Sequence, residues 1–244
     1  MTAAGCDGRP APRVPSATAR PGGRVGEVPG WLRDLAASAE RMEVPAELRP
    51  PADGGRRSAI LILFGDAGAG PDLLLVQRSD SLRRHAGQPA FPGGVIDAED
   101  HGPAGAALRE ASEEAGVDPG GVDVISVLPD LYIARTGYLV SPVLAWWRKP
   151  VPVAPGDPAE VASVARVPVA DLADPRHRLM IRYPSGQAGP AFQAGGMLIW
   201  GFTALVIDGL LTMGGWARAW DATSVVDLPP GVTLTGIDGA DPVS

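Results

Sequence analysis

The segment GGVIDAEDHGPAGAALREASEEAGV, residues 93–117, places three carboxylates within five positions of the chain. Glu110, Glu113 and Glu114 have the i, i+3, i+4 spacing that brings side chains onto one face of a helix, with Cβ atoms about 5–6 Å apart. Carboxylates this close repel one another unless a cation neutralises them. Because Mg²⁺ prefers such oxygen ligands, the spacing favours a divalent-metal site.

The alternative interpretation of this acidic stretch is a solvated face on a surface helix, which is the usual role of a run of charges. The flanking residues favour the metal site. A Gly-Gly turn follows the step Phe91–Pro92, and residues 106–108 (Ala-Ala-Leu) can bury the opposite face of the helix. Gly116 supplies a C-terminal stop. Arg109 is placed to orient a carboxylate through both prongs of its guanidinium.

This segment resembles the Nudix box, G-x5-E-x7-R-E-U-x-E-E-x-G-U, in which U is an aliphatic residue. The matching residues are Gly94, Arg109, Glu110, Glu113, Glu114, Gly116 and Val117. The chain departs from the box at Asp100, which replaces the first glutamate, and at Ala111, a small residue at an aliphatic position. The gap between Asp100 and Arg109 is also one residue longer than in the box. The extra residue and the aspartate are similar to the variant found in the coenzyme A pyrophosphatase branch of the family.

A second motif, LLVQRSDSLRRHAGQPAFPGG at residues 74–94, directly precedes the box. It is similar to the coenzyme A diphosphatase signature L-L-T-x-R-[SA]-x3-R-x3-G-x3-F-P-G-G. The matching residues are Leu74, Leu75, Arg78, Ser79, Arg83, Gly87, Phe91, Pro92, Gly93 and Gly94. Val76 departs, where the signature has threonine. Together the two motifs place the resemblance over roughly residues 57–211.

Composition excludes several other classes of protein. The net charge of −7, from 21 basic and 28 acidic residues, argues against general nucleic-acid binding. Cys6 is the only cysteine, so no disulfide framework is expected, and a cytoplasmic location fits. No apolar run is long enough to span a membrane, and no signal-peptide core follows the N-terminal arginines. The oligomeric state is not predicted by any of these features.

The expected fold class is α/β (α+β), with hairpins, a mixed β-sheet and flanking helices, and the resemblance implies the Nudix α/β/α sandwich. The chain is interpreted as a flexible head at residues 1–28, one Nudix domain at residues 29–213 and a tail at residues 214–244. Strands are expected at residues 58–64, 72–78, 122–128, 138–147, 161–167 and 180–183. Helices are expected at residues 31–42, from near 103, from near 169, and at 197–211.

Three finer expectations concern irregular positions. Pro142 suggests that its strand lies at an edge of the sheet or contains a bulge. Residues 185–196 are expected to form a loop. The Gly-, Pro- and Asp-rich sequence from Gly214 onward is expected to hold little regular structure.

The resemblance implies a hydrolase that depends on Mg²⁺ or Mn²⁺, in which water attacks a diphosphate bridge. It implies Glu110 and Glu114 as metal ligands, with Glu113 as a third ligand or as a contact of a metal-bound water. Arg109 is expected to orient the carboxylates. Gly94 is expected to let the backbone approach the metal or phosphate closely. Asp97 and Asp100 are equally consistent with turn capping and with a metal role.

The general base and the substrate contacts stay open at this point. Glu113 and Glu160 are the two alternatives for the base, and Glu160 is also consistent with an ordinary exposed loop acid. Arg78 and Arg83 are candidates for binding the phosphates of a small-molecule substrate, because arginine matches phosphate geometry. The alternative is that these arginines belong to a solvated basic turn without a binding role.

Three functions are compatible with this pattern. The first is cleavage of coenzyme A or acyl-coenzyme A to 3′,5′-ADP and 4′-phosphopantetheine or its acyl form. The second is the same chemistry on ADP-ribose, NADH or another nucleoside diphosphate derivative. The third is a non-catalytic ligand-sensing domain, which the intact carboxylates disfavour.

Overall fold

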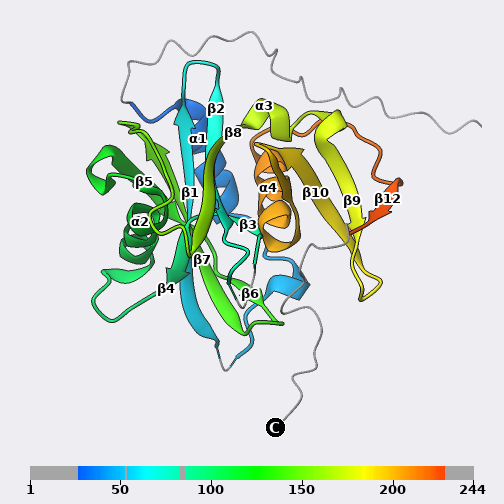
Figure 1. Cartoon of the computed structure of the whole chain (residues 1–244), viewed down its shortest axis with the longest axis horizontal. Coiled ribbons are helices and arrows are strands. Elements are labelled where there is room, and N and C mark those ends of the chain that lie inside the picture. The colour runs from blue at the N-terminus through cyan, green and yellow to red at the C-terminus, as the bar shows by residue number, and fades with distance from the viewer. Residues whose placement is uncertain (1–26, 53, 83–85, 229–244) are drawn as a thin grey trace, which may run out of the picture.

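The chain folds around a mixed β-sheet that has helices on both faces (Figure 1). The computed structural model describes residues 27–52, 54–82 and 86–228. The main sheet has eight strands with the central order β3-β2-β1-β7-β5, while β4 pairs with β1, β6 with β7 and β8 with β2. These strands are β1 (Arg56–Asp66), β2 (Pro71–Arg78), β3 (Pro89–Ala90), β4 (Gly93–Val95), β5 (Val122–Val127), β6 (Leu131–Ile133), β7 (Tyr138–Trp147) and β8 (Val161–Pro168).

The helices and a smaller sheet complete the fold. The α-helices are α1 (Gly30–Glu40), α2 (Gly102–Ala115), α3 (Val169–Leu172) and α4 (Gly201–Met213), and the short 3-10 helices are η1 (Ala46–Leu48), η2 (Pro119–Gly121) and η3 (Pro175–His177). A four-stranded sheet with the order β11-β10-β9-β12 lies to one side. Its strands are β9 (Arg178–Arg182), β10 (Ala188–Ala194), β11 (Met197–Ile199) and β12 (Val225–Asp227).

Strand β1 is the centre of the main sheet. Its far end forms the expected antiparallel hairpin with β2, where Phe64 lies opposite Leu73. Its other edge runs parallel to β7 from Arg56 to Phe64. A strand enclosed in this way is buried on both faces, which explains its continuous apolar sequence. The first half of β1 pairs with β4, so the Gly93–Gly94 turn is attached to the middle of the domain.

Helix α2 packs on one face of the sheet through small residues. Ala106, Ala107, Ala111 and Ala115 are all fully buried there, in a cluster that includes Leu61 of β1. Alanine side chains let the helix axis approach the strands closely. The carboxylate-bearing face of α2 is therefore held at a fixed height above β1 and β4.

Helices α1 and α4 cover the opposite face of the sheet. Trp31 of α1 meets Phe64 edge-on with ring centroids 5.3 Å apart, and Trp216 lies 5.2 Å from Trp31. With α2 on the other face, this gives the expected α/β/α layering (Figure 1). The proposed domain limits at residues 28 and 213 stay a prediction, although Trp216 lies beyond the second limit and packs against this core.

The C-terminal apolar run is divided where a single helix was expected. Met197–Ile199 is strand β11, paired with β10, and α4 begins only at Gly201. Trp200 is fully extended (φ −148°, ψ −179°), and Gly201 has a φ of +66°, a left-handed value that glycine adopts without strain. An apolar run of this length does not distinguish strand from helix, because both bury it equally well.

One other expectation about this region was wrong. The expected loop at residues 185–196 contains strand β10, whose Gly189–Pro190 step has the composition of a turn but pairs with β9. Little regular structure was expected beyond Gly214, and in residues 215–228 the chain forms only the three-residue strand β12, Val225–Asp227, parallel to β9. Strand β10 forms a hairpin with the preceding strand β9, whereas the pairing of β12 with β9 joins segments remote in sequence, which local composition does not record.

The expectation for Pro142 was also wrong, because β7 is an internal strand. Pro142 pairs with Ile60 of β1 on one side, and its carbonyl accepts a hydrogen bond from the Leu128 amide on the other (2.8 Å). In a strand, the N–H and C=O of one residue point to the same side. The missing N–H of Pro142 therefore faces the break between β5 and β6 and costs no ladder hydrogen bond. The register shift in this region lies in β5, between Val124 and Ser126.

In the part of the chain that the structure describes, no helix has both the length and the apolar content needed to cross a bilayer.

Candidate active site

The candidate site lies where the turn between β3 and β4 meets the polar face of α2. Pro92 and Ile96 hold β4 against β1, since the Pro92 carbonyl accepts from Leu61 (2.8 Å) and the Ile96 amide donates to Arg57 (3.2 Å). The amide of Gly93, the residue after Pro92, donates to Oε2 of Glu114 (3.1 Å). A backbone amide of the glycine turn and a carboxylate of α2 are therefore directly joined.

Glu114 is the most buried carboxylate of the acidic cluster, with only 6% of its side chain exposed. Burial raises its pKa from the ordinary 4.5 to about 7, and the nearby charges of Glu110 and Glu160 act in the same direction. The hydrogen bond from Gly93 and the positive charge of Arg78 oppose that rise. A buried carboxylate with a strongly raised pKa beside other charged groups is a candidate functional group.

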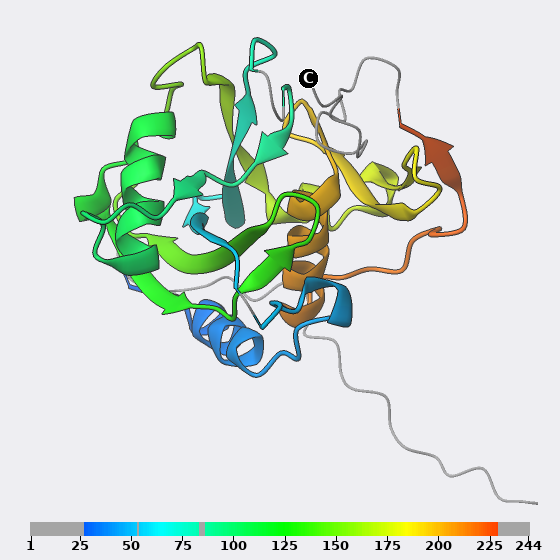
Figure 2. The ribbon, with the colours of Figure 1, turned by 90° about the horizontal axis from the view of Figure 1, so that it is seen from below.

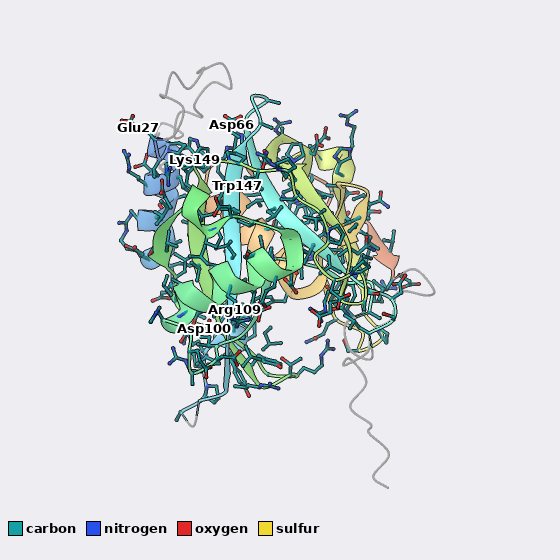
Figure 3. All side chains as sticks on the ribbon, turned by 60° about the vertical axis from the view of Figure 1, so that its left-hand side comes forward. Glu27, Asp66, Asp100, Arg109, Trp147 and Lys149 are labelled. Atoms are coloured by element: carbon teal, nitrogen blue, oxygen red, sulfur yellow. The ribbon has the colours of Figure 1, made fainter. Side chains whose placement is uncertain are left out.

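Arg109 connects the acidic residues of the site. Its Nε and Nη2 donate to the two oxygens of Asp100, both at 3.0 Å. The two residues are labelled next to each other in Figure 3. The Nη1 of Arg109 donates to Glu110 (3.0 Å) and Glu113 (3.1 Å), and its Nη2 also reaches the Val95 carbonyl (3.1 Å). The arginine thus fixes carboxylates from the loop and from the helix relative to one another, in the geometry expected for an orienting residue.

Asp100 has the contacts of a turn cap and of an arginine partner. Its Oδ2 accepts from the Asp97 amide (2.9 Å), and the hydrogen bonds from Arg109 are the main cause of its lowered pKa. Asp97 lies 3.6 Å from Arg109 and is mostly exposed. Of the two interpretations of these aspartates, the contacts favour capping and support of Arg109 over metal binding.

Gly94 leaves room for the carboxylate of Glu110. A Cβ atom at position 94 would overlap that carboxylate. Glu110 is 18% exposed, and burial raises its pKa, against the opposing effect of Arg109. Glycine at this position therefore allows the close approach of the Glu110 side chain to the backbone, while the expected contact of Gly94 with a metal or phosphate stays a prediction.

A second loop, residues 154–160, closes over the C-terminal end of α2. The Gly156 amide donates to the Glu114 carbonyl (3.1 Å), and a Cβ at Gly156 would overlap the Glu113 carbonyl. This loop carries Glu160, an exposed residue whose carbonyl accepts from the Ser79 amide (2.8 Å). Sequence reasoning missed Gly156, since the stretch Pro-Gly-Asp-Pro around it has the composition of an ordinary turn.

Arg78 comes to the same site from the end of β2. Its Nη1 lies 3.7 Å from Oε1 of Glu114, and its Nε is buried without a hydrogen-bond partner. A buried N–H without a partner is costly unless a further acceptor reaches it. Arg83, the other expected phosphate contact, lies outside the described residues.

The donors at this site fit a hard divalent cation. Within residues 27–52, 54–82 and 86–228, no three His, Cys, Asp or Glu side chains converge as a complete metal site. Mg²⁺ is commonly bound by only one or two carboxylates, with waters and substrate phosphates filling the other positions. Glu110 and Glu114, both with pKa values raised by burial, supply such a pair. Glu113 is 59% exposed and turned toward Arg109, so it is the outermost of the three expected ligands.

The raised pKa of Glu114 predicts a pH-dependent stability of the metal-free protein. A carboxyl group with a raised pKa stabilises the fold fully below pH 4.5, and that contribution is lost as pH rises through about 7. The loss amounts to about 3 kcal/mol at most, or roughly 5–10 °C in melting temperature for a domain of this size. In chelator, the melting temperature of the native protein should therefore fall relative to that of Glu114→Gln between pH 4.5 and 8. A constant difference across that range would contradict the prediction.

The chain is similar to a known protein family and to individual relatives. The profile of the NUDIX domain matches residues 54–184. The "Uncharacterized Nudix hydrolase NudL" of Citrobacter koseri is 48% identical over 100 residues, which cover 40% of this chain and 52% of that protein. The protein of the same description in Escherichia coli K12 is 47% identical over 100 residues, 41% of this chain and 51% of that one. The chain thus spans about half the length of the curated relatives it matches.

Solved structures also resemble the chain. RenU, a Nudix hydrolase from M. smegmatis, has 19% identity and a TM-score of 0.48, covering 72% of this chain and 99% of that one. The NUDIX domain of Shewanella oneidensis NrtR, solved in complex with ADP ribose, has 22% identity and a TM-score of 0.41, covering 56% and 84%.

Proposed function

Because this chain belongs to the Nudix family, we propose that it is a divalent-metal-dependent hydrolase that cleaves the diphosphate bond of coenzyme A or an acyl-coenzyme A. The products are 3′,5′-ADP and 4′-phosphopantetheine or its acyl form. The net charge of −7 fits a small-molecule substrate better than a nucleic acid. We place the activity in the cytoplasm, which suits a chain with a single cysteine.

The observation that carries the coenzyme A assignment is the position of Arg78. This residue belongs to the motif upstream of the box, yet its guanidinium lies against Glu114 in the centre of the acidic site. The upstream motif is therefore part of the same site as the carboxylates. The buried Nε of Arg78 has no acceptor within the described residues, and we propose that a phosphate oxygen of the substrate is its acceptor.

In the proposed reaction, water attacks one phosphorus of the diphosphate bridge, and the bond from that phosphorus to the bridging oxygen breaks. The bridging oxygen leaves as part of the second phosphate monoester. Arg78 holds the phosphates, Gly93 and Arg109 fix the orientation of the carboxylates, and Gly94 lets the substrate approach the backbone.

Glu110 and Glu114 are the proposed ligands of Mg²⁺ or Mn²⁺, with Glu113 or the Gly94 carbonyl completing the protein's share. A bound divalent ion would neutralise phosphate charge and lower the pKa of the attacking water. The choice between the two metals depends on the full coordination shell, to which substrate and water also contribute.

Glu160 is the proposed general base. Arg109 already engages Glu113, whereas the loop that carries Glu160 lies against α2 and its charge is felt at Glu114. We expect Glu160→Gln to lower kcat more than Glu113→Gln does, while leaving the affinity for Mn²⁺ unchanged. Titration of each variant with Mn²⁺ beside its steady-state kinetics checks this. A weakened Mn²⁺ affinity in Glu160→Gln would make that residue a ligand instead.

A product assay tests the substrate assignment. Purified protein is incubated with Mg²⁺ or Mn²⁺ and coenzyme A, with ADP-ribose and NADH in parallel, and the products are resolved by chromatography. We expect 3′,5′-ADP from coenzyme A and much slower cleavage of the other two compounds. Faster cleavage of ADP-ribose or NADH would leave general Nudix chemistry standing and overturn the coenzyme A assignment.

A further inference from the structure

An apolar cavity of about 180 Å³ lies between α4, η1, β6 and the face of the main sheet opposite α2. Figure 2 shows these elements side by side, with η1 next to α4 and β6. Its walls are almost entirely hydrocarbon, as shown by Met42, Leu48, Ile62 and Met213. The one charged lining residue, Asp208, is paired with the buried Arg178. The surface of the cavity is therefore almost entirely apolar.

The cavity exists in part because α4 has a glycine where a side chain would fit. Gly209 lines the cavity, and a Cβ built there would meet only the Met213 side chain, at 4.0 Å. Gly209 does not have a left-handed φ, so its backbone conformation does not require glycine. Glycine in a helix interior is less favourable than alanine. The residue thus lowers helix stability and leaves the cavity open.

The cavity adjoins a more polar hollow. Leu205 lines both, and 38% of this leucine is exposed. The second hollow, about 530 Å³, is lined by Tyr183, Ser185 and Gln187 among others. A molecule that spans the two would place a polar portion at the surface and a hydrocarbon end inside.

Helix α4 connects this region to the candidate active site. The hydroxyl of Thr203, two residues before Leu205 in α4, donates a hydrogen bond to the Pro89 carbonyl (3.0 Å). Pro89 begins β3 and lies four residues before Gly93, whose amide holds Glu114. A hydrogen bond therefore joins α4, which forms one wall of the cavity, to the strand that precedes the glycine turn.

We propose that this cavity binds the acyl chain of an acyl-coenzyme A substrate; this inference rests on the proposed function. An apolar cavity of about 150 Å³ remains dry and accepts a benzene molecule. A cavity of about 180 Å³ therefore suits a straight chain of about six carbons. The thioester and the pantetheine arm would lie in the polar hollow beyond Leu205.

The test is a chain-length series with a cavity-filling variant. For the native protein, kcat/KM is measured for coenzyme A and for its acetyl, butanoyl, hexanoyl and octanoyl thioesters. We expect kcat/KM to rise about fourfold for each methylene buried and to level off near six carbons. Gly209→Leu, which fills the cavity, should abolish the rise and leave the cleavage of free coenzyme A unchanged.

Thr212→Leu is the matched control, because it adds the same side chain to an exposed position of α4 that does not line the cavity. It should retain the chain-length dependence. Binding of hexanoyl-coenzyme A and coenzyme A to the metal-free proteins gives a readout that does not need turnover. Cleavage without chain-length dependence, or a dependence that survives in Gly209→Leu, overturns the cavity proposal alone. Failure to cleave any of these compounds overturns the proposed function itself.

Discussion

Replacing Glu114 by glutamine should lower kcat/KM by more than about 100-fold, since residues that merely support metal ligands already account for roughly 10–100-fold. Glu114 is the buried carboxylate that Gly93 orients and Arg78 approaches. Its amide keeps the shape and can still accept from Gly93, but it carries no charge for a divalent ion. The fold should therefore persist while turnover and metal affinity are lost.

Steady-state kinetics and Mn²⁺ titration of Glu114→Gln provide the measurement, with circular dichroism to verify folding. Glu43→Gln, the same change at an exposed residue outside the site, is the control and should behave like the native protein. This variant also decides the non-catalytic alternative. If the native protein turns over substrate and Glu114→Gln does not, a purely ligand-sensing domain is excluded. Undiminished turnover in the variant would remove Glu114 from the metal site.

The five longer strands of the main sheet and α2 were predictable because their signals are local and repeated, whereas the two- and three-residue strands β3, β4 and β6 were not expected. β1 and β2 are continuous apolar runs separated by a glycine turn, and α2 has small residues on one side, carboxylates on the other and Gly116 at its end. β10 and β11 gave no such signal. The Gly189–Pro190 step of β10 has the composition of a turn, and the apolar residues of β11 continue into those of α4, so neither strand is marked by its own sequence.

The candidate site was predictable to a similar extent. Helical spacing places Glu110, Glu113 and Glu114 on one face. The structure shows in addition that the three side chains are buried to different extents, which spacing alone does not predict. That inequality arises from segments remote in sequence. Gly93 caps one carboxylate, and the loop of Gly156 covers the end of the helix. Contacts of this kind depend on the tertiary fold and cannot be read from one helix.

The two adjacent glycines of the turn provide the sharpest separation of activity from stability. The atoms nearest to a Cβ at Gly94 would be those of the Glu110 carboxylate, the far end of a flexible side chain that can move aside. Gly94→Ala should therefore fold with nearly native stability, yet lose about 10–100-fold in kcat/KM because a ligand carboxylate is displaced. A Cβ at Gly93 would instead overlap the backbone of Ala59 and Ile60 in the central strand. Gly93→Ala should lower the free energy of unfolding by about 1–3 kcal/mol or more.

Thermal melting and kcat/KM measured on both variants check this pair, and each serves as the control for the other. If the overlap with the Glu110 carboxylate causes the loss of activity in Gly94→Ala, a shorter side chain at position 110 should restore part of the function. The double variant Gly94→Ala, Glu110→Asp shortens that side chain by one methylene and should recover part of the Mn²⁺ affinity lost in Gly94→Ala. Equal melting temperatures for the two single variants, or an inactive Gly94→Ala whose Mn²⁺ affinity is native, would show that the turn does not act through Glu110. Gly94 would then be needed for direct contact between the backbone and the phosphates of the substrate.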